Sequence, residues 1–196
     1  MAINVRSENL ALRVWFIMHR TRDVLSRCED KVFSKYGLTA EQYSVLATMK
    51  SLEGPIRITD VARWLERSTN SVSMIIDRMV KAGLVKRARD RSDRRAVRLV
   101  ITSKAEEALK PATLAAFDFI QEVTSPLSHE DKRTFVNLHE MVKYKACQCL
   151  DPDVDIEEMK SNDITNQPDL MNRLCQYLST SALETKHQRG KKKKAM

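Results

Sequence analysis

Residues 58–102 read ITDVARWLERSTNSVSMIIDRMVKAGLVKRARDRSDRRAVRLVIT, and this stretch decides the fold. Two short segments with helical spacing come first, and two β-like runs around a polar, arginine-rich tip follow. This order predicts a helix-turn-helix followed by a β-hairpin wing. On a DNA duplex, the second helix of such a unit fits the major groove, and a basic hairpin can reach phosphates and the neighbouring minor groove.

The two helices are indicated by their caps and their apolar spacing. Thr59 is the predicted N-cap of the first helix, and Ser68 is that of the second. A buried face of the second helix is predicted from residues at helical spacing, namely Val72, Ile75, Ile76, Met79 and Val80. Gly83 then supplies the left-handed residue that commonly ends a helix.

The opposite face of the second helix carries mostly small and polar side chains. Such side chains can hydrogen-bond to base edges and let the backbone come close to them. We therefore predict DNA contacts from this helix at Ser68, Thr69, Asn70, Ser71, Ser73, Met74 and Arg78. Asp77, on the same helix, is predicted to hold a basic side chain in position.

The wing is expected from strands over residues 84–89 and 96–102. From Arg63 to Arg98 there are eleven Lys or Arg residues against four acids, an excess of seven positive charges in a chain of net charge +8. At the wing tip we predict DNA contacts from Arg91, Arg94 and Arg95, with Asp93 orienting Arg95 or another basic side chain. The alternative is a solvated hairpin tip with ordinary surface charge.

At these residues the chain resembles the MarR family of bacterial winged-helix transcriptional regulators. The matching pieces are Val61-Ala62 with Leu65, Ser68, Val72-Ser73, residues 76–79, residues 83–85, the wing stretch DRSDRRA at 90–96 and the strand exit at 99–102. The match is strongest over residues 58–105 and extends by helix pattern alone over about 8–150. The resemblance implies a homodimer that binds double-stranded DNA at a pseudo-palindromic operator and often responds to a small ligand or an oxidant.

Long amphipathic helices are predicted on both sides of this unit. Ser7 is the expected cap of the first, and Thr39 with Gln42 forms a predicted capping box for the next. After the wing, Pro111 predicts a kink or a break near Lys110. With a short β segment after the second helix, the expected order is helix, helix, β, helix, helix, hairpin, helix, helix.

These elements predict a mainly α fold with a small β-hairpin wing, in which long dimerisation helices flank a winged helix-turn-helix domain. We predict an N-terminal dimerisation helix over 1–37, the DNA-binding domain over 38–102, C-terminal dimerisation helices over 103–150, and an acidic linker, short helix and basic tail over 151–196. The flanking helices carry more apolar face than one small domain needs, which favours burial by a second copy. The alternative is an intramolecular bundle.

An effector pocket follows from the resemblance, which places ligands between the dimer helices and the wing domain. Its predicted lining is Trp15, Met18, His19, Arg22, Tyr43 and Met49. Aromatic rings with His19 or Arg22 as an anion anchor suit a phenolic or carboxylate ligand. The alternative is that Trp15 and Tyr43 belong to the core and that His19 and Arg22 are solvated.

Other classes of protein find little support in the sequence. There is no nucleophile–base spacing, phosphate loop or metal-ligand cluster, so we expect neither an enzyme nor a bound cofactor or metal. The scattered Cys28, Cys147, Cys149 and Cys175 do not suggest a disulfide scaffold. No apolar run reaches membrane-spanning length and the start has no signal core, so we expect a cytoplasmic protein without a membrane partner.

The sequence thus predicts a sequence-specific, DNA-binding transcriptional regulator. The resemblance adds the expectation of a repressor that a small aromatic or phenolic effector releases from its operator. Two alternatives stay open: a non-specific architectural DNA-binding protein, favoured by the basic tail HQRGKKKKAM, and a regulator that responds to oxidants through a cysteine.

Overall fold

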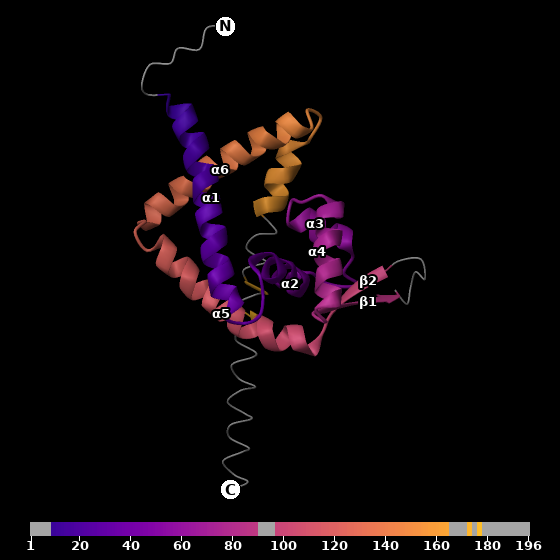
Figure 1. Ribbon diagram of the computed structural model, residues 1–196. Helices are drawn as coiled ribbons and strands as arrows, with labels where there is room; N and C mark the ends of the chain where they lie inside the picture. The colour runs from indigo at the N-terminus through magenta and orange to yellow at the C-terminus, as the bar shows by residue number, and fades with distance from the viewer. Residues whose placement is uncertain (1–8, 90–96, 165–171, 174–175, 178–196) are drawn as a thin grey trace.

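The computed structural model describes residues 9–89, 97–164, 172–173 and 176–177. The elements, labelled in Figure 1, are α1 (Leu10–Ser34), α2 (Ala40–Ser51), α3 (Ile58–Trp64), α4 (Thr69–Lys81), β1 (Val85–Arg89), β2 (Val97–Ile101), α5 (Ser103–Thr124) and α6 (His129–Leu150). Residues 156–164 form a further short helix. The predicted mainly α fold with a small hairpin is therefore confirmed.

The hydrophobic core lies where α2, α3, α4, the hairpin and the first half of α5 meet. The apolar face predicted for α4 is buried, with Val72, Ile76 and Met79 fully enclosed. Gly83 adopts a φ of +72° directly after α4, a conformation that glycine adopts without steric cost. The chain can therefore reverse at this point and begin β1 against the core.

The hairpin pairs β1 and β2 antiparallel, in a register that sets Val85 opposite Ile101 and Arg89 opposite Val97. The β segment expected after α2 is reduced to one backbone hydrogen bond, in which Leu99 N–H donates to Ile56 O at 2.8 Å. The Thr102 hydroxyl donates to Gly83 O at 2.7 Å and accepts from Ala105 N–H at 3.2 Å. One side chain thus joins the end of the hairpin to the start of α5.

Two predicted helix starts are wrong. Helix α1 begins at Leu10 and is capped by Asn9; Ser7 lies outside the described residues. Helix α3 begins at Ile58, before Thr59, because the Asp60 carboxylate accepts a hydrogen bond from Arg57 N–H at 2.9 Å. The Asp60 carboxylate, inside the first turn, thus satisfies the backbone N–H of the residue that precedes α3.

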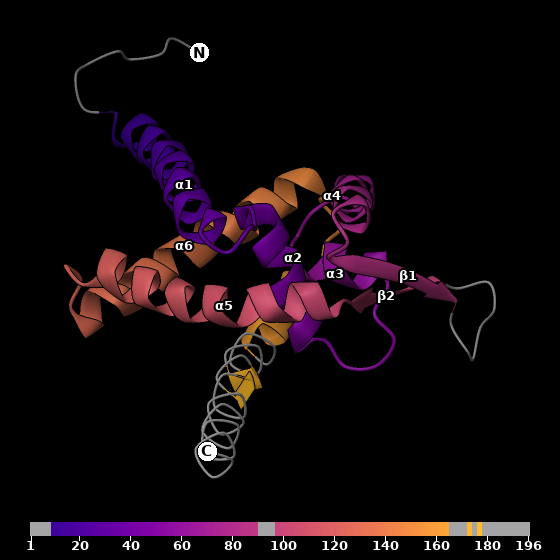
Figure 2. The same ribbon diagram turned by 60° about the horizontal axis from the view of Figure 1, so that its bottom comes forward.

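Pro111 lies inside α5 without breaking it, so the expected break near Lys110 does not occur. Figure 2 shows α5 running from the end of β2 to the turn before α6. Leu109 and Ala112 are fully buried on either side of the proline, and the Thr113 hydroxyl donates to Leu109 O at 2.8 Å. Tertiary packing here outweighs the poor helix propensity of proline.

The flanking helices leave large apolar side chains in solvent within one chain. On α1, Trp15, Phe16 and Ile17 are each about 60% exposed, and α6 has no buried residue at all. Figure 1 shows α1 extending from the molecule on the side away from the hairpin, and α6 running from the far end of α5 back toward α3 and α4. Among the described residues, no helix combines the length and apolar character needed to cross a bilayer.

A pair of alanine variants tests the starts of α3 and α4. Ser68→Ala should lower the free energy of unfolding by about 1 kcal/mol, because the Ser68 hydroxyl accepts from Ser71 N–H at the start of α4. Thr59→Ala should change it by less than about 0.5 kcal/mol, since Thr59 is exposed inside α3. Urea unfolding at one fixed protein concentration measures both, and a larger loss in Thr59→Ala would contradict the placement of α3.

Candidate nucleic-acid interface

Helix α4 presents a polar outer face opposite its buried one. Thr69, Asn70 and Ser71 are exposed in its first turn, and Met74 is 60% exposed one turn later. Of the other predicted contacts on this helix, Arg78 is exposed and Ser73 is half-buried. The structure therefore brings the predicted α4 residues to one surface, where short side chains leave the backbone accessible.

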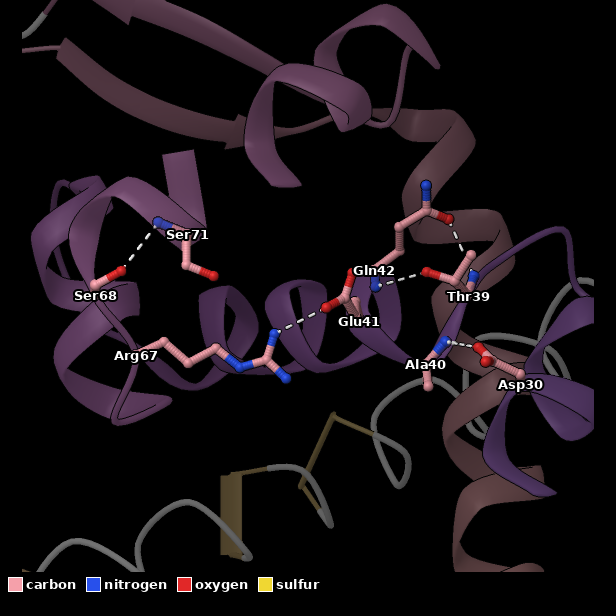
Figure 3. Close-up of polar contacts among 8 residues, drawn as sticks. All are labelled: Asp30, Thr39, Ala40, Glu41, Gln42, Arg67, Ser68 and Ser71. Carbon is pink, nitrogen blue, oxygen red and sulfur yellow. Dashed lines mark hydrogen bonds and ion pairs between the residues drawn. The ribbon is translucent and has the colours of Figure 1, made fainter. Parts of the chain in front are cut away.

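The start of α4 is fixed by side chains from two elements (Figure 3). Ser68 accepts a hydrogen bond from Ser71 N–H at 3.2 Å, which leaves the Ser68 hydroxyl hydrogen free to donate outward. Arg67, one residue earlier, pairs with Glu41 of α2 at 3.1 Å. Since the positive end of the helix dipole lies at this terminus, it favours an approaching phosphate.

The start of α2 is held in a similar way. Thr39 and Gln42 form the predicted capping box, with bonds of 3.2 Å and 3.0 Å, and this prediction is confirmed. Asp30 of α1 also accepts from Ala40 N–H at 2.8 Å (Figure 3). Helix α2 is thus tied to α1 at its first residue and, through Glu41, to the turn before α4.

The hairpin adds exposed positive charge beside α4. Asp77 of α4 pairs with Arg87 of β1, with 2.7 Å between Oδ1 and Nη1. The sequence pattern did not identify Arg87 as this partner. Exposed Lys86 and Arg89 were also absent from the predicted contacts, although their place in the dense basic segment could have suggested them. The wing-tip residues Arg91, Asp93, Arg94 and Arg95 lie outside the described residues.

The predicted effector-pocket residues do not meet in one hollow of a single chain. Met49 is 1% exposed and belongs to the core. Tyr43 is half-buried and stacks on Phe33 with ring centroids 4.0 Å apart; burial raises the pKa of Tyr43. On α1, Trp15 and His19 form an exposed ring pair 4.3 Å apart, Met18 is half-buried, and Arg22 pairs with its neighbour Asp23.

Two hollows lie elsewhere, and neither is lined by those six residues. One, of about 520 Å³, lies between α3 and residues 156–164, with Ile56, Trp64 and Met159 in its wall. The other, of about 340 Å³, lies between α1, α2 and α4 and includes Asp30 and Arg78. Within the described ranges, no group of His, Cys, Asp and Glu is arranged to hold a metal ion.

The chain thus contains a winged helix-turn-helix unit with an exposed polar face on α4 and basic strands beside it. A family model described as the MarR family matches residues 36–96. The regulator MgrA of Staphylococcus aureus is 31% identical over 125 residues, which cover 63% of this chain and 84% of MgrA.

The chain belongs to the MarR family.

Solved structures agree with this assignment. The organohalide-sensing regulator RdhR, in its 2,4-dichlorophenol-bound form, shares the fold with a TM-score of 0.66 at 18% identity, over 76% of this chain and 92% of that one. Overoxidised AbfR bound to DNA is 26% identical with a TM-score of 0.55, over 69% of this chain and 93% of that one. The protein is therefore a MarR-family transcriptional regulator with a winged helix-turn-helix for DNA binding.

The Asp77–Arg87 pair is expected to fix geometry more than stability. Both side chains are well exposed, at 52% and 38%, so solvent screens their attraction. In a double-mutant cycle with Asp77→Asn and Arg87→Gln, the coupling free energy for unfolding should lie between 0 and about 1 kcal/mol. Urea unfolding measures this quantity, and a coupling above about 2 kcal/mol would contradict a solvent-screened pair.

Proposed function

We propose that this MarR-family regulator is a repressor that binds a pseudo-palindromic operator as a homodimer and is released by a small aromatic or phenolic effector. The observation that carries the proposal is the pairing of two surfaces in one chain. An exposed polar face on α4 suits bases, and exposed apolar faces on α1 and α6 suit a second copy.

The apolar faces support the homodimer. Beyond α1, the exposed large apolar side chains of the last two helices are Leu114, Ile120, Val123, Phe135, Val136, Leu138, Met141, Val142 and Leu150. Exposed apolar side chains in this number are costly in water and favour burial in an interface. Since a symmetric dimer presents each recognition helix twice, its operator has two related half-sites.

The proposed contacts divide into base readers and phosphate binders. Thr69, Asn70, Ser71, Ser73 and Met74 face base edges in the major groove. Ser68 and Arg78 bind phosphates at the groove edge, and Arg91, Arg94 and Arg95 of the wing reach the backbone or a narrow minor groove. Asp77 and Asp93 orient basic side chains of the wing, as the Asp77–Arg87 pair illustrates.

The proposed effector is aromatic because the surface of α1 offers a ring to stack on. Trp15 and His19 form their exposed pair on the helix face that a second copy would cover. A ligand held there, with Met18, Arg22 or Tyr43 near its edge, would alter how the two chains meet. Such a change would alter the spacing of the two α4 helices and weaken binding at one half-site when the other is occupied.

Selection of bound sequences from a random duplex pool, at physiological salt, tests the proposal. We expect enrichment of an inverted repeat whose half-sites lie about ten base pairs apart. In a reporter strain, that repeat placed over a promoter should lower expression, and phenolic compounds should restore it. DNA binding without any enriched sequence would contradict the proposal and indicate a DNA-coating protein.

Substitution of Asn70 tests the role of α4 in reading bases. Asn70→Ala should weaken binding to the selected operator by about 1–3 kcal/mol and weaken binding to random DNA much less, because among the bases an amide pairs through two hydrogen bonds best with adenine. Fluorescence anisotropy on both duplexes gives the two losses. Asn162→Ala, which removes an exposed amide from residues 156–164, is the matched control. Equal losses on the two duplexes would exclude base reading by Asn70.

The wing arginines are expected to act through phosphates. Arg94→Ala and Arg95→Ala should each weaken binding and reduce the slope of log affinity against log salt by about 1, because each removes one phosphate contact. Titrations at several salt concentrations measure the slope, with Arg133→Ala on α6 as the charge-matched control. If both variants have the same salt slope as the Arg133→Ala control, Arg94 and Arg95 do not contact phosphates.

A further inference from the structure

Packing within one chain does not fix the position of α6. None of its side chains is buried, and Phe135, Leu138 and Met141 are at least half exposed. A helix without buried contacts can change its angle to the rest of the chain at little cost. Whatever holds α6 relative to the DNA-binding domain must therefore come from its polar side chains or from the chain that follows it.

Lys143 of α6 supplies a polar tie of this kind. Its ammonium group lies 2.5 Å from Glu66 Oε1 and 2.9 Å from Asp163 Oδ2. The Tyr144 hydroxyl donates to the same Asp163 oxygen at 3.0 Å. We call these four residues the Lys143 clamp. It joins α6, the turn between α3 and α4, and the helix of residues 156–164.

The Lys143–Asp163 side of the clamp is partly shielded from solvent, whereas the Glu66 side chain is 51% exposed and its attraction to Lys143 is screened more. The side chains of Lys143 and Asp163 are 26% and 21% exposed. Burial alone would lower the pKa of Lys143, but the hydrogen bonds to Asp163 and Glu66 outweigh it and raise that pKa well above its usual value. Burial, together with the bond to Asp163, raises the pKa of Tyr144 to about 12. At neutral pH, Lys143 therefore carries its charge and Tyr144 its proton.

The clamp reaches the recognition helix through a short and constrained turn. Glu66 has a φ of +50°, the one positive value found for a non-glycine residue in the described ranges. Two residues later Ser68 caps α4, and between them Arg67 is held by Glu41. By binding Glu66, Lys143 therefore restrains the backbone immediately before α4.

Apolar packing does not replace the clamp at this junction. The hollow of about 520 Å³ separates part of α3 from residues 156–164, so these two helices do not pack closely along their length. Figure 1 shows the helix of residues 156–164, in orange, descending from the end of α6 toward α3. The ion pairs of Lys143 therefore set the distance and angle between α3 and residues 156–164, which packing across the hollow does not set.

We propose that Lys143 is a positioning residue for operator binding. By holding Glu66 and Asp163 together, it fixes the angle between α4 and α6. Since α6 belongs to the interface of the homodimer under the proposed function, on which this inference rests, that angle sets the separation of the two recognition helices. The clamp thereby determines which spacing of half-sites the dimer accepts.

Operators with altered spacers test the inference. The selected inverted repeat is prepared with its spacer unchanged, or longer or shorter by one and two base pairs. Wild type should bind the natural spacer at least about tenfold more tightly than the neighbouring ones, because each added base pair shifts and rotates a half-site. Lys143→Met should bind the natural spacer about 3–10-fold more weakly and discriminate among spacers at least about threefold less.

Companion variants separate positioning from general destabilisation. Lys143→Arg should keep the wild-type spacer profile, because it retains a cation that can bridge both carboxylates. Asp163→Asn should behave like Lys143→Met while changing little in shape. Lys145→Met removes a lysine from the same helix that bonds only to Gln148 among the described contacts, at 3.3 Å, and should match wild type.

Each other outcome has a definite meaning. A spacer profile in Lys143→Met and Asp163→Asn equal to that of Lys145→Met overturns the inference. A uniform loss at every spacer, together with a lower melting temperature, shows a merely structural role and also overturns it. If wild type itself prefers no inverted repeat, the proposed function fails first, and the inference fails with it.

Discussion

The helix-turn-helix unit closes its own hydrophobic core, whereas α1 and α6 expose their apolar faces. Val45, Leu46, Val72, Ile76 and Met79 are fully enclosed by α2, α4, the hairpin and α5. In contrast, Phe16 and Ile17 of α1 remain about 60% exposed. Burying one such side chain stabilises a fold or an interface by about 1.5–3 kcal/mol. Burial of these side chains therefore favours association of the long helices of one chain with those of another.

The buried helix-turn-helix unit and the exposed helices α1 and α6 have different roles. Because the inner face of α4 is packed in the core, its outer face is free to contact DNA. The caps at Thr39, Ser68 and Thr102 fix where α2, α4 and α5 begin. Under the proposed function, α1 and α6 pair two chains into a symmetric dimer, which an operator with two half-sites requires. Between the two lies the Lys143 clamp, where charge rather than packing connects the interface to the recognition helix.

Local patterns predicted the DNA-binding unit well because its elements are determined locally. The apolar spacing of α4 and the glycine at 83 place the helix and its end, and alternation along residues 97–101 places β2. The start of α3 was missed because Asp60 acts from inside the first turn, a choice that residue preferences alone do not reveal. Of the kink or break expected at Pro111, the break does not occur, because buried neighbours hold the helix together.

The remaining features depend on contacts between distant parts of the chain. Nothing near Glu66 in the sequence indicates that Lys143 will reach it, and nothing near Asp77 selects Arg87 over the other basic residues of the wing. The helical spacing of Met49 is compatible with a pocket wall and with the core. Its burial in the packed structure shows that it belongs to the core. Single-sequence patterns define faces of helices but leave open what each face meets.

The pairing of the exposed helices is the central claim, and sedimentation equilibrium of the purified protein tests it most directly. Wild type should sediment with the mass of two chains at micromolar concentration. Ile17→Glu, which places a charge in the middle of the apolar face of α1, should shift the equilibrium toward one chain while keeping its helical circular dichroism. A wild-type protein that sediments as a single chain at every concentration, and still binds an inverted repeat with full affinity, would contradict the account.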